Sequence, residues 1–278
     1  MDVHGGLLFR GFNVRTPVEF DRFITVTAGA PVNYMERSSP RTRVEGNIYT
    51  STDYPANQAI FLHNEQSYNR QFPLRIYFCC LQPAATGGET PIADCRRVYA
   101  RLRPATIERF RAGYLYVRNF GAGVGLAWQE AFQTQEKNRV EEYCANNSIE
   151  CRWLPGDGLR TQQLRRAMAT HPRTAQTVWF NHCTFFHVST LPVIVQEVLR
   201  MQPEGLPNQT YFADGSEIAP DILDELRAAY QAETRAFKWE LGDVLMLVNM
   251  MVAHGRRPFS GPRKVVVGMA DLYTWDSV

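Results

Sequence analysis

The sequence predicts an α+β protein built around an antiparallel barrel or jelly roll. Strand-like segments occupy both ends of the 278-residue chain, and helical segments lie between them. The chain is 45% hydrophobic and 21% charged and has no internal repeat, so we expect one domain over residues 1–278 with a helical insertion around 94–236. Periodicity alone does not choose among the possible barrels.

Seven apolar or β-branched runs have the length and composition of strands. They cover Gly6–Phe12, Ala59–His63, Leu74–Leu81, Tyr114–Val117, Thr177–Phe180, Val244–Val248 and Lys264–Leu272. Turns that contain proline or glycine separate the elements along the chain.

Three other segments are predicted to be helical. The first, Asp94–Arg111, starts with a capping aspartate and repeats apolar residues at roughly helical spacing, although Pro104 should break it. The second is Leu191–Met201, and the third runs from about Pro220 to Arg235 with one apolar face.

Composition excludes several classes of protein. The net charge is only +2 and the basic residues are scattered, which argues against a nucleic-acid partner. The N-terminus lacks the pattern of a signal peptide, and the longest apolar run, Val244–Ala253, is interrupted by Asn249 and too short to span a bilayer. The six cysteines form no CxxC pair, and adjacent Cys79 and Cys80 should point to opposite faces of a strand. We therefore expect a cytoplasmic protein with reduced, partly buried thiols and no membrane partner.

The first candidate for chemistry is a pair of residues at the end of a predicted strand. His63 and Glu65 are two apart, so both side chains should leave the strand from the same face. One imidazole and one carboxylate, completed by a second histidine far along the chain, make the triad that leaves open positions on Fe(II). A solvated strand end is the alternative interpretation, because a lone His-x-Glu is common.

Further motifs give this pair a context. They are GGLLFRGF at the start, YTSTDYP at 49–55, HNE at 63–65, GGET at 87–90, and WxxGDxLxxxN leading into HGRxPF at 254–259, with Arg263 beyond. In this order they resemble the taurine dioxygenase and clavaminate synthase-like family of Fe(II)/2-oxoglutarate oxygenases, nearest the branch of the syringomycin biosynthetic hydroxylase. The resemblance covers nearly the whole chain. It implies a double-stranded β-helix, or jelly-roll, core with inserted and flanking helices.

The resemblance also implies roles for five residues. His63, Glu65 and His254 would be the catalytic ligands of Fe(II), while Arg263 and Thr90 would bind the distal carboxylate of 2-oxoglutarate, with O2 as the other cosubstrate. The chemistry agrees, because a guanidinium pairs bidentately with a carboxylate and a hydroxyl adds a charge-assisted bond. A surface arginine and a turn hydroxyl that bonds the local backbone are the alternatives.

Several residues in or near these motifs are not expected to take part in catalysis. Gly242 and Asp243 are expected to form a turn before the strand that delivers His254, and Trp239 is expected in the core. Asn181 and His182 are expected to be substrate contacts or packing groups. His4 and His171 have no supporting context, and we expect both to be exposed.

The resemblance implies that oxidative decarboxylation of 2-oxoglutarate is coupled to hydroxylation of an unactivated C–H bond. Related halogenases lack the carboxylate ligand, whereas Glu65 retains it here, so halogenation is disfavoured. Desaturation, epoxidation and cyclisation share the same ligands and stay open as alternatives.

The substrate is constrained by one departure from the family pattern. Relatives that act on small acids often carry a second arginine four residues after the cofactor arginine, and that position is Val267 here. Unless Arg41, Arg118 or Arg256 binds a substrate anion, we expect an amino-acid-derived metabolite of natural-product biosynthesis whose carboxylate is masked, for example as a thioester on a carrier protein.

Two other classes of protein remain as alternatives. One is a catalytically silent jelly-roll binding protein, and the other is a zinc hydrolase that uses His63, His182 and His187. The sequence leaves the oligomeric state open, a homo-oligomer included. Similar proteins usually have more residues before GGLLFRGF, so we expect part of the substrate lid to be missing or supplied by a partner subunit.

Overall fold

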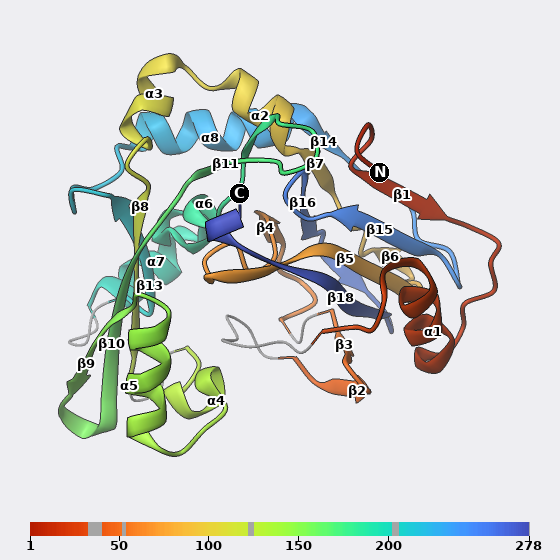
Figure 1. The fold of residues 1–278 in the computed structure, drawn as a ribbon, viewed down its shortest axis with the longest axis horizontal. Coiled ribbons are helices and arrows are strands. Elements are labelled where there is room, and N and C mark those ends of the chain that lie inside the picture. Colours follow the sequence, from red (N-terminus) through yellow and green to blue (C-terminus); the bar gives the residue numbers. More distant parts are fainter. Residues whose placement is uncertain (33–40, 52–53, 122–124, 202–205, 278) are drawn as a thin grey trace.

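The computed structural model describes residues 1–32, 41–51, 54–121, 125–201 and 206–277. Thr52 and Asp53 of the YTSTDYP motif lie outside the described residues. The described chain is α+β, with antiparallel sheets and flanking helices, which confirms the expected class (Figure 1).

The largest sheet has six strands, and its order places strands from both ends of the chain side by side. In that order they are β1 (Gly6–Phe9), β15 (Val244–Val248), β5 (Gln71–Gln82), β18 (Lys264–Thr274), β3 (Ile48–Thr50) and β2 (Arg43–Glu45). A four-stranded sheet carries the HNE and HGRxPF motifs. Its order is β14 (Thr234–Arg235), β7 (Ile92–Asp94), β16 (Val252–Arg256) and β4 (Ile60–His63).

The core lies between these two sheets. Alternate residues of the central strand β5 point to opposite faces, so Cys80 joins the main core while Cys79 packs under a helix with Phe20 and Ile24. The predicted opposite orientation of the two cysteines is therefore confirmed. All six cysteines are free thiols, and only Cys151 is partly exposed.

The helix over Cys79 is α1 (Pro17–Ala28), which was not among the predicted helices. Its first turn holds a capping box, in which Thr16 accepts from the backbone of Glu19 and the Glu19 side chain accepts from the backbone of Thr16. Phe20 and Ile24 are fully buried against the six-stranded sheet.

The predicted helix at Asp94–Arg111 is two helices. Asp94 caps α2 (Cys95–Arg101) by accepting from the backbone N–H of Arg96 at 2.9 Å, and Pro104 then begins α3 (Pro104–Arg109). The other two predicted helices are present as α7 (Val193–Arg200) and α8 (Pro220–Glu233).

A third sheet lies between α3 and α8 in the sequence. Its strands, in order, are β13 (Asn208–Phe212), β8 (Tyr114–Phe120), β10 (Gly158–Arg165) and β9 (Glu150–Leu154). Only its β8 was predicted. In Figure 1 this sheet lies on the left with α4 (Trp128–Phe132) and α5 (Lys137–Asn146), while α2, α3 and α8 lie along the top.

The remaining elements are short. They are β6 (Thr86–Gly87) paired with β17 (Phe259–Ser260), β11 (Met168–Thr170) paired with β12 (Thr177–Trp179), α6 (Cys183–Phe186), and the 3-10 turns η1 (Pro155–Asp157), η2 (Val188–Thr190) and η3 (Trp275–Ser277). Within the ranges that the structure describes, no helix combines the length and apolar character needed to cross a membrane.

Candidate metal centre and active-site cavity

His63 and His254 meet because they are direct partners across two antiparallel strands. His63 ends β4, His254 lies in β16, and the register pairs the two residues. Side chains of paired residues share a face of the sheet, and the two ring centroids are 4.6 Å apart. Gly255 allows this close approach, since a Cβ there would lie 2.5 Å from the carbonyl oxygen of Ile60.

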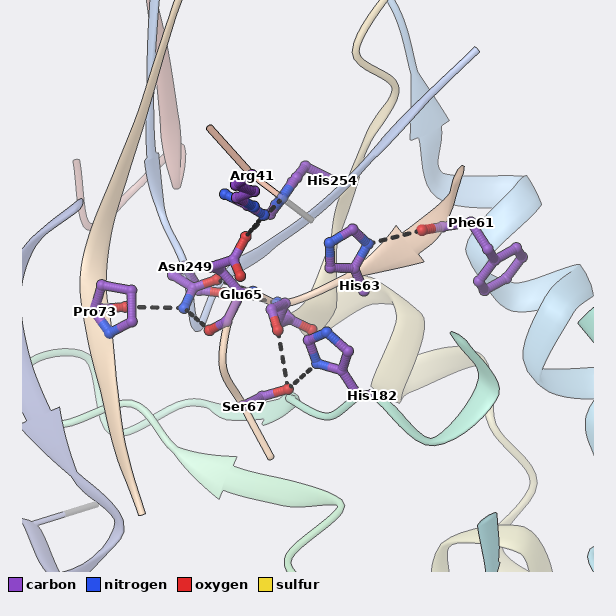
Figure 2. A network of polar contacts seen from close by, with 10 residues as sticks. Arg41, Phe61, His63, Glu65, Ser67, Pro73, His182, Asn249 and His254 are labelled. Atoms are coloured by element: carbon purple, nitrogen blue, oxygen red, sulfur yellow. Dashed lines mark hydrogen bonds and ion pairs between the residues drawn. The ribbon is translucent and has the colours of Figure 1, made fainter. Parts of the chain in front are cut away.

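Glu65 completes a cluster with the two histidines. One ligand atom from each of His63, Glu65 and His254 lies within 4.8 Å of the others, and all three side chains are buried (Figure 2). The shortest contact between Glu65 and His254 joins Oε2 and Nε2 at 3.9 Å. Two imidazoles and one carboxylate are a suitable donor set for a divalent transition metal.

Burial favours the neutral form of both histidines, which is the form that binds a metal. Burial lowers the pKa of His63, and burial together with the nearby His63 and Arg41 lowers the pKa of His254 well below its ordinary value. Nδ1 of His63 lies 2.8 Å from the carbonyl oxygen of Phe61, so a proton on Nδ1 leaves the Nε2 lone pair for a metal. Phe78 packs on His254 and Phe185 on His63, with centroids 4.9 and 4.6 Å apart.

Two residues that the sequence analysis did not assign to the centre hold Glu65. Arg41, which was considered only for substrate binding, donates from Nη2 to Oε2 of Glu65 at 2.7 Å. Asn249 binds the backbone of Glu65 from the opposite end of the chain, accepting from its N–H and donating to its carbonyl, both at 2.8 Å. Two signals for Asn249 were visible in the sequence, its place at the end of the WxxGDxLxxxN motif and its position as the polar residue that interrupts an apolar run.

The metal-ligand cluster opens on a cavity of about 930 Å³. His63 and His254 line it, together with Arg41, Thr90 and Arg263. Residues of β8, α6, η2 and α7 line the rest, among them Phe120, Phe185, Val188 and Leu199. A site of this size, largely apolar with a few polar groups, is typical of a small-molecule pocket.

Thr90 and Arg263 both line this cavity, as the motif analysis anticipated. The GGET segment runs beside β16, since the backbone N–H of Gly255 donates to Pro91 and that of Arg257 to Glu89. Oγ1 of Thr90 accepts from Nε1 of Trp239 at 3.1 Å, so the Thr90 proton is available for an acceptor in the cavity. Trp239 is buried as expected and also orients Thr90.

Arg263 presents a partly buried cation to the same space. Its Nε donates to the carbonyl of Gly88 at 3.1 Å, and Gly88 has a φ of +73°, where a Cβ would lie 3.0 Å from the Arg263 side chain. Burial, followed by the charge of nearby Arg256, lowers the pKa of Arg263 to about 10. A carboxylate bound here would compensate the buried charge.

The comparisons with known proteins agree with this geometry. The model of the family "Taurine catabolism dioxygenase TauD, TfdA family" matches residues 1–269. The chain belongs to this family. It is a 2-oxoglutarate-dependent non-haem iron dioxygenase, with Fe(II), 2-oxoglutarate and O2 as its cofactor and cosubstrates.

Curated relatives of this dioxygenase match over most of their length. It is 40% identical over 270 residues to dapdiamide synthesis protein DdaC of Enterobacter agglomerans, covering 96% of this chain and 82% of that protein. It is 29% identical over 276 residues to a clavaminate synthase-like protein of Arabidopsis thaliana, covering 95% and 81%.

Solved structures share the fold at low identity. PvcB from Pseudomonas aeruginosa matches with a TM-score of 0.55 and 16% identity, covering 97% of this chain and 76% of that one. Asparagine oxygenase in complex with Fe(II), hydroxyasparagine and succinate matches with a TM-score of 0.58 and 14% identity, covering 96% and 74%.

The dioxygenase uses Asn181 and His182 for packing. Asn181 donates to the carbonyl of Ala167 and accepts from the N–H of Cys183 at the start of α6. His182 stacks on Phe186 and shares a hydrogen bond of 2.7 Å with Ser67. Neither Asn181 nor His182 is among the described residues that line the cavity, so substrate contact is not favoured for them.

The histidine set of a zinc hydrolase is not assembled. In the ranges that the structure covers, the group of potential ligands that converges is His63, Glu65 and His254, without His182 or His187. The expectation that His171 is exposed was wrong. It is fully buried, and its Nδ1 accepts from the backbone of Thr174 in the turn between β11 and β12.

Arg256 and Arg118 differ as candidates for a substrate anion. Arg256 donates to the carbonyls of Tyr54, Pro55 and Gln58, so it holds the segment that forms one wall of the cavity. Arg118 is buried, lines the cavity and lies with its guanidinium carbon 4.5 Å from the centroid of the Phe120 ring.

Proposed function

We propose that His63, Glu65 and His254 hold Fe(II) in this dioxygenase, which hydroxylates an unactivated C–H bond of an amino-acid-derived metabolite in natural-product biosynthesis. The convergence of these three ligand atoms within 4.8 Å, with both histidines lining a cavity, carries the proposal. A structural role alone would not need two neutral imidazoles and a carboxylate buried side by side.

Arg263 and Thr90 are the proposed anchor for the distal carboxylate of 2-oxoglutarate. They supply a partly buried cation and a hydroxyl to the cavity that His254 also lines. Iron and 2-oxoglutarate together supply the oxidising chemistry when bound. The side chains of the cavity orient both and exclude water, with Phe78 and Phe185 restricting rotation of the two histidines.

The six-stranded and four-stranded sheets are the proposed double-stranded β-helix of this family, with residues 94–236 as the insertion. Residues of both sheets share one core, and His254 of one sheet packs on Phe78 of the other. The insertion supplies β8, α6 and α7, whose residues form the substrate side of the cavity.

The substrate class rests on the relatives and on the cavity. DdaC is named for dapdiamide synthesis, PvcB for an isonitrile synthetic pathway, and asparagine oxygenase for an amino acid. Val267 is buried in β18 and Arg256 holds backbone carbonyls, so neither repeats the anion-binding arginine of small-acid oxygenases. Arg118 also lines the cavity, so a free carboxylate bound by Arg118 is the alternative. Our hypothesis is a masked carboxylate, for example a thioester on a carrier protein.

A substrate screen tests this function. The enzyme, loaded with Fe(II) and 2-oxoglutarate, is given amino acids as free acids, as amides and as carrier-protein thioesters, and O2 uptake, succinate and product mass are followed. We expect one masked amino acid to produce succinate in step with a product that gains one oxygen. A free amino acid turned over as fast as any masked form would contradict the masked-carboxylate hypothesis, and a product that loses two hydrogens would contradict hydroxylation.

A further inference from the structure

Asn249 is a fully buried polar residue between two strands of different sheets. It follows the end of β15 and lies in the turn that leads into β16, five residues before His254. A buried amide costs free energy unless its donors and acceptor are all satisfied. The hydrogen-bond partners of Asn249 therefore indicate which part of the structure its side chain positions.

The side chain of Asn249 binds the backbone of Glu65 at two points (Figure 2). Oδ1 accepts from the N–H of Glu65 at 2.8 Å, and Nδ2 donates to the carbonyl of Glu65 at 2.8 Å and to that of Pro73 at 2.9 Å. The two bonds to Glu65 join residues that are 184 positions apart in the chain.

Glu65 needs this support because the strand ladder stops before it. The pairing of β4 with β16 ends at His63 opposite His254, so the sheet provides no partner for the peptide groups of Glu65. The amide of Asn249 offers one acceptor and one donor in the place where a neighbouring strand would offer a carbonyl and an N–H.

Asn64 holds Asn249 in return. Its Nδ2 donates to the carbonyl of Asn249 at 2.6 Å, and the backbone N–H of Asn249 donates to Leu74 at 2.8 Å. Ser67 extends the network, with its Oγ 3.0 Å from the carbonyl of Asn64 and 2.7 Å from Nδ1 of His182. The segment that carries two candidate ligands and the turn that leads to the third are thus locked together.

We propose that Asn249, held by Asn64, is a positioning residue that fixes Glu65 relative to His254 and thereby sets the affinity of the site for its metal. The inference rests on the proposed function, because it takes these two residues as iron ligands. Loss of groups that orient metal ligands typically weakens metal binding about 10–100-fold. A residue that merely stabilised the fold would lower the melting temperature and leave the affinity of the folded protein unchanged.

The test compares metal affinity with stability in matched variants. Asn249→Ala removes all three side-chain bonds, and Asn249→Asp keeps the acceptor for the Glu65 N–H and loses donors. Asn64→Ala removes the bond to the Asn249 carbonyl together with the contacts of the Asn64 amide with Cys95 Sγ. Asn181→Ala is the control, because Asn181 is equally buried and its amide also joins two backbone groups, at Ala167 and Cys183. Each folded, metal-free protein is titrated anaerobically with Fe(II), and the visible band that appears with 2-oxoglutarate is recorded at saturating metal.

We expect the affinity of Asn249→Ala for Fe(II) to be about 10–100-fold lower than that of the wild type. Asn249→Asp and Asn64→Ala should lose less affinity than Asn249→Ala. Asn181→Ala should keep the wild-type affinity even where its melting temperature falls. The band of the Asn249 variants should also shift, because the ligand field changes. Wild-type affinity and band in folded Asn249→Ala would overturn the inference alone. If neither Asn249 variant folds, the test is the Fe(II) affinity of Asn64→Ala, and wild-type affinity in that variant would overturn the inference. Wild-type protein that binds no Fe(II) would overturn the proposed function and this inference with it.

Discussion

Arg41 donates a hydrogen bond of 2.7 Å to Oε2 of Glu65, and the same oxygen lies 3.9 Å from Nε2 of His254. Both members of the Arg41–Glu65 pair are buried. In the metal-free protein this guanidinium compensates the charge of a carboxylate that would otherwise be costly to bury. A bound divalent metal would share or take over that role.

Replacing Arg41 should therefore lower the stability of the metal-free protein and increase the stabilisation that a bound metal gives. In Arg41→Gln the Glu65 carboxylate loses its charged partner, and we expect the metal-free protein to lose about 3 kcal/mol of unfolding free energy. Added Fe(II) should then raise the melting temperature more than it does in the wild type, because the metal restores the missing positive charge. Anaerobic thermal melts with and without Fe(II) measure both effects.

Arg10→Gln is the control for Arg41→Gln. Arg10 pairs with buried Asp243 on another part of the six-stranded sheet, so its loss should lower stability and leave the metal-induced rise unchanged. Equal metal-induced rises in Arg41→Gln and the wild type would contradict the proposed relation.

Arg263→Gln should weaken the binding of 2-oxoglutarate. Losing a charge-assisted hydrogen bond to the distal carboxylate predicts a dissociation constant about 10–100-fold higher, with Fe(II) affinity unchanged. Calorimetry on the metal-loaded protein under anaerobic conditions measures both constants. Arg257→Gln is a suitable control, because Arg257 lies in the HGRxPF motif shortly before Arg263 and is exposed. Equal affinity of the Arg263 and Arg257 variants for 2-oxoglutarate would contradict the proposed role of Arg263 in binding it.

Thr90→Val should have a smaller effect of the same kind. Valine keeps the shape of threonine but removes the hydroxyl that Trp239 orients, so we expect 2-oxoglutarate to bind about 3–10-fold more weakly. Thr86→Val provides the comparison, since Thr86 is exposed and its hydroxyl bonds Ser260 of the paired strand β17. The same calorimetric titration with 2-oxoglutarate measures this effect. A Thr90 variant that binds 2-oxoglutarate with wild-type affinity would contradict a role of the hydroxyl in binding.

His187 should make stability depend on pH. Burial, followed by the charges of Arg227 and Arg200, lowers the pKa of His187 to about 4 from an ordinary value of 6.5. The unfolded chain therefore binds this proton more readily, so the contribution is fully present above pH 6.5 and is lost as the pH falls toward 4, by up to about 3 kcal/mol. Other buried histidines with lowered pKa values, such as His182, add to the same slope.

Urea unfolding of metal-free His187→Asn at several pH values tests this. Asparagine can still accept the hydrogen bond from the backbone N–H of Ser189 but does not titrate. We expect a shallower fall in unfolding free energy between pH 6.5 and 4 than in the wild type. Parallel curves would contradict the assignment.

The sequence predicted the elements whose signals are local. Apolar runs marked β4, β5, β15 and β18, and a capping aspartate marked α2. The ligand atoms of His63 and Glu65 converge as their spacing suggested, although β4 ends at His63 and Glu65 follows it in a turn. The capping box at Thr16 was also visible, although the short α1 that follows it was not recognised.

What escaped prediction depends on contacts between distant segments. The strands β9, β10 and β13 have buried polar residues such as Thr161 and Gln163, so they lack the apolar alternation of a strand with one solvent face. The sequence gives no sign of the contact between Asn249 and Glu65, which only the fold brings together. Arg41 was considered only as a partner for a substrate anion, because its contact with the same residue also depends on the fold. His171 was wrongly expected at the surface because the turn that buries it has no distinctive pattern.

The most direct test of the account is anaerobic addition of Fe(II) and then 2-oxoglutarate to metal-free protein, following the visible charge-transfer band of an iron-bound oxo acid, with His254→Ala alongside. The account predicts a band in the wild type that needs both additions and is absent from the folded variant. A folded, metal-free wild type that develops no band, or a His254→Ala protein that develops the same band, would contradict the assignment of His63, Glu65 and His254 as the iron site.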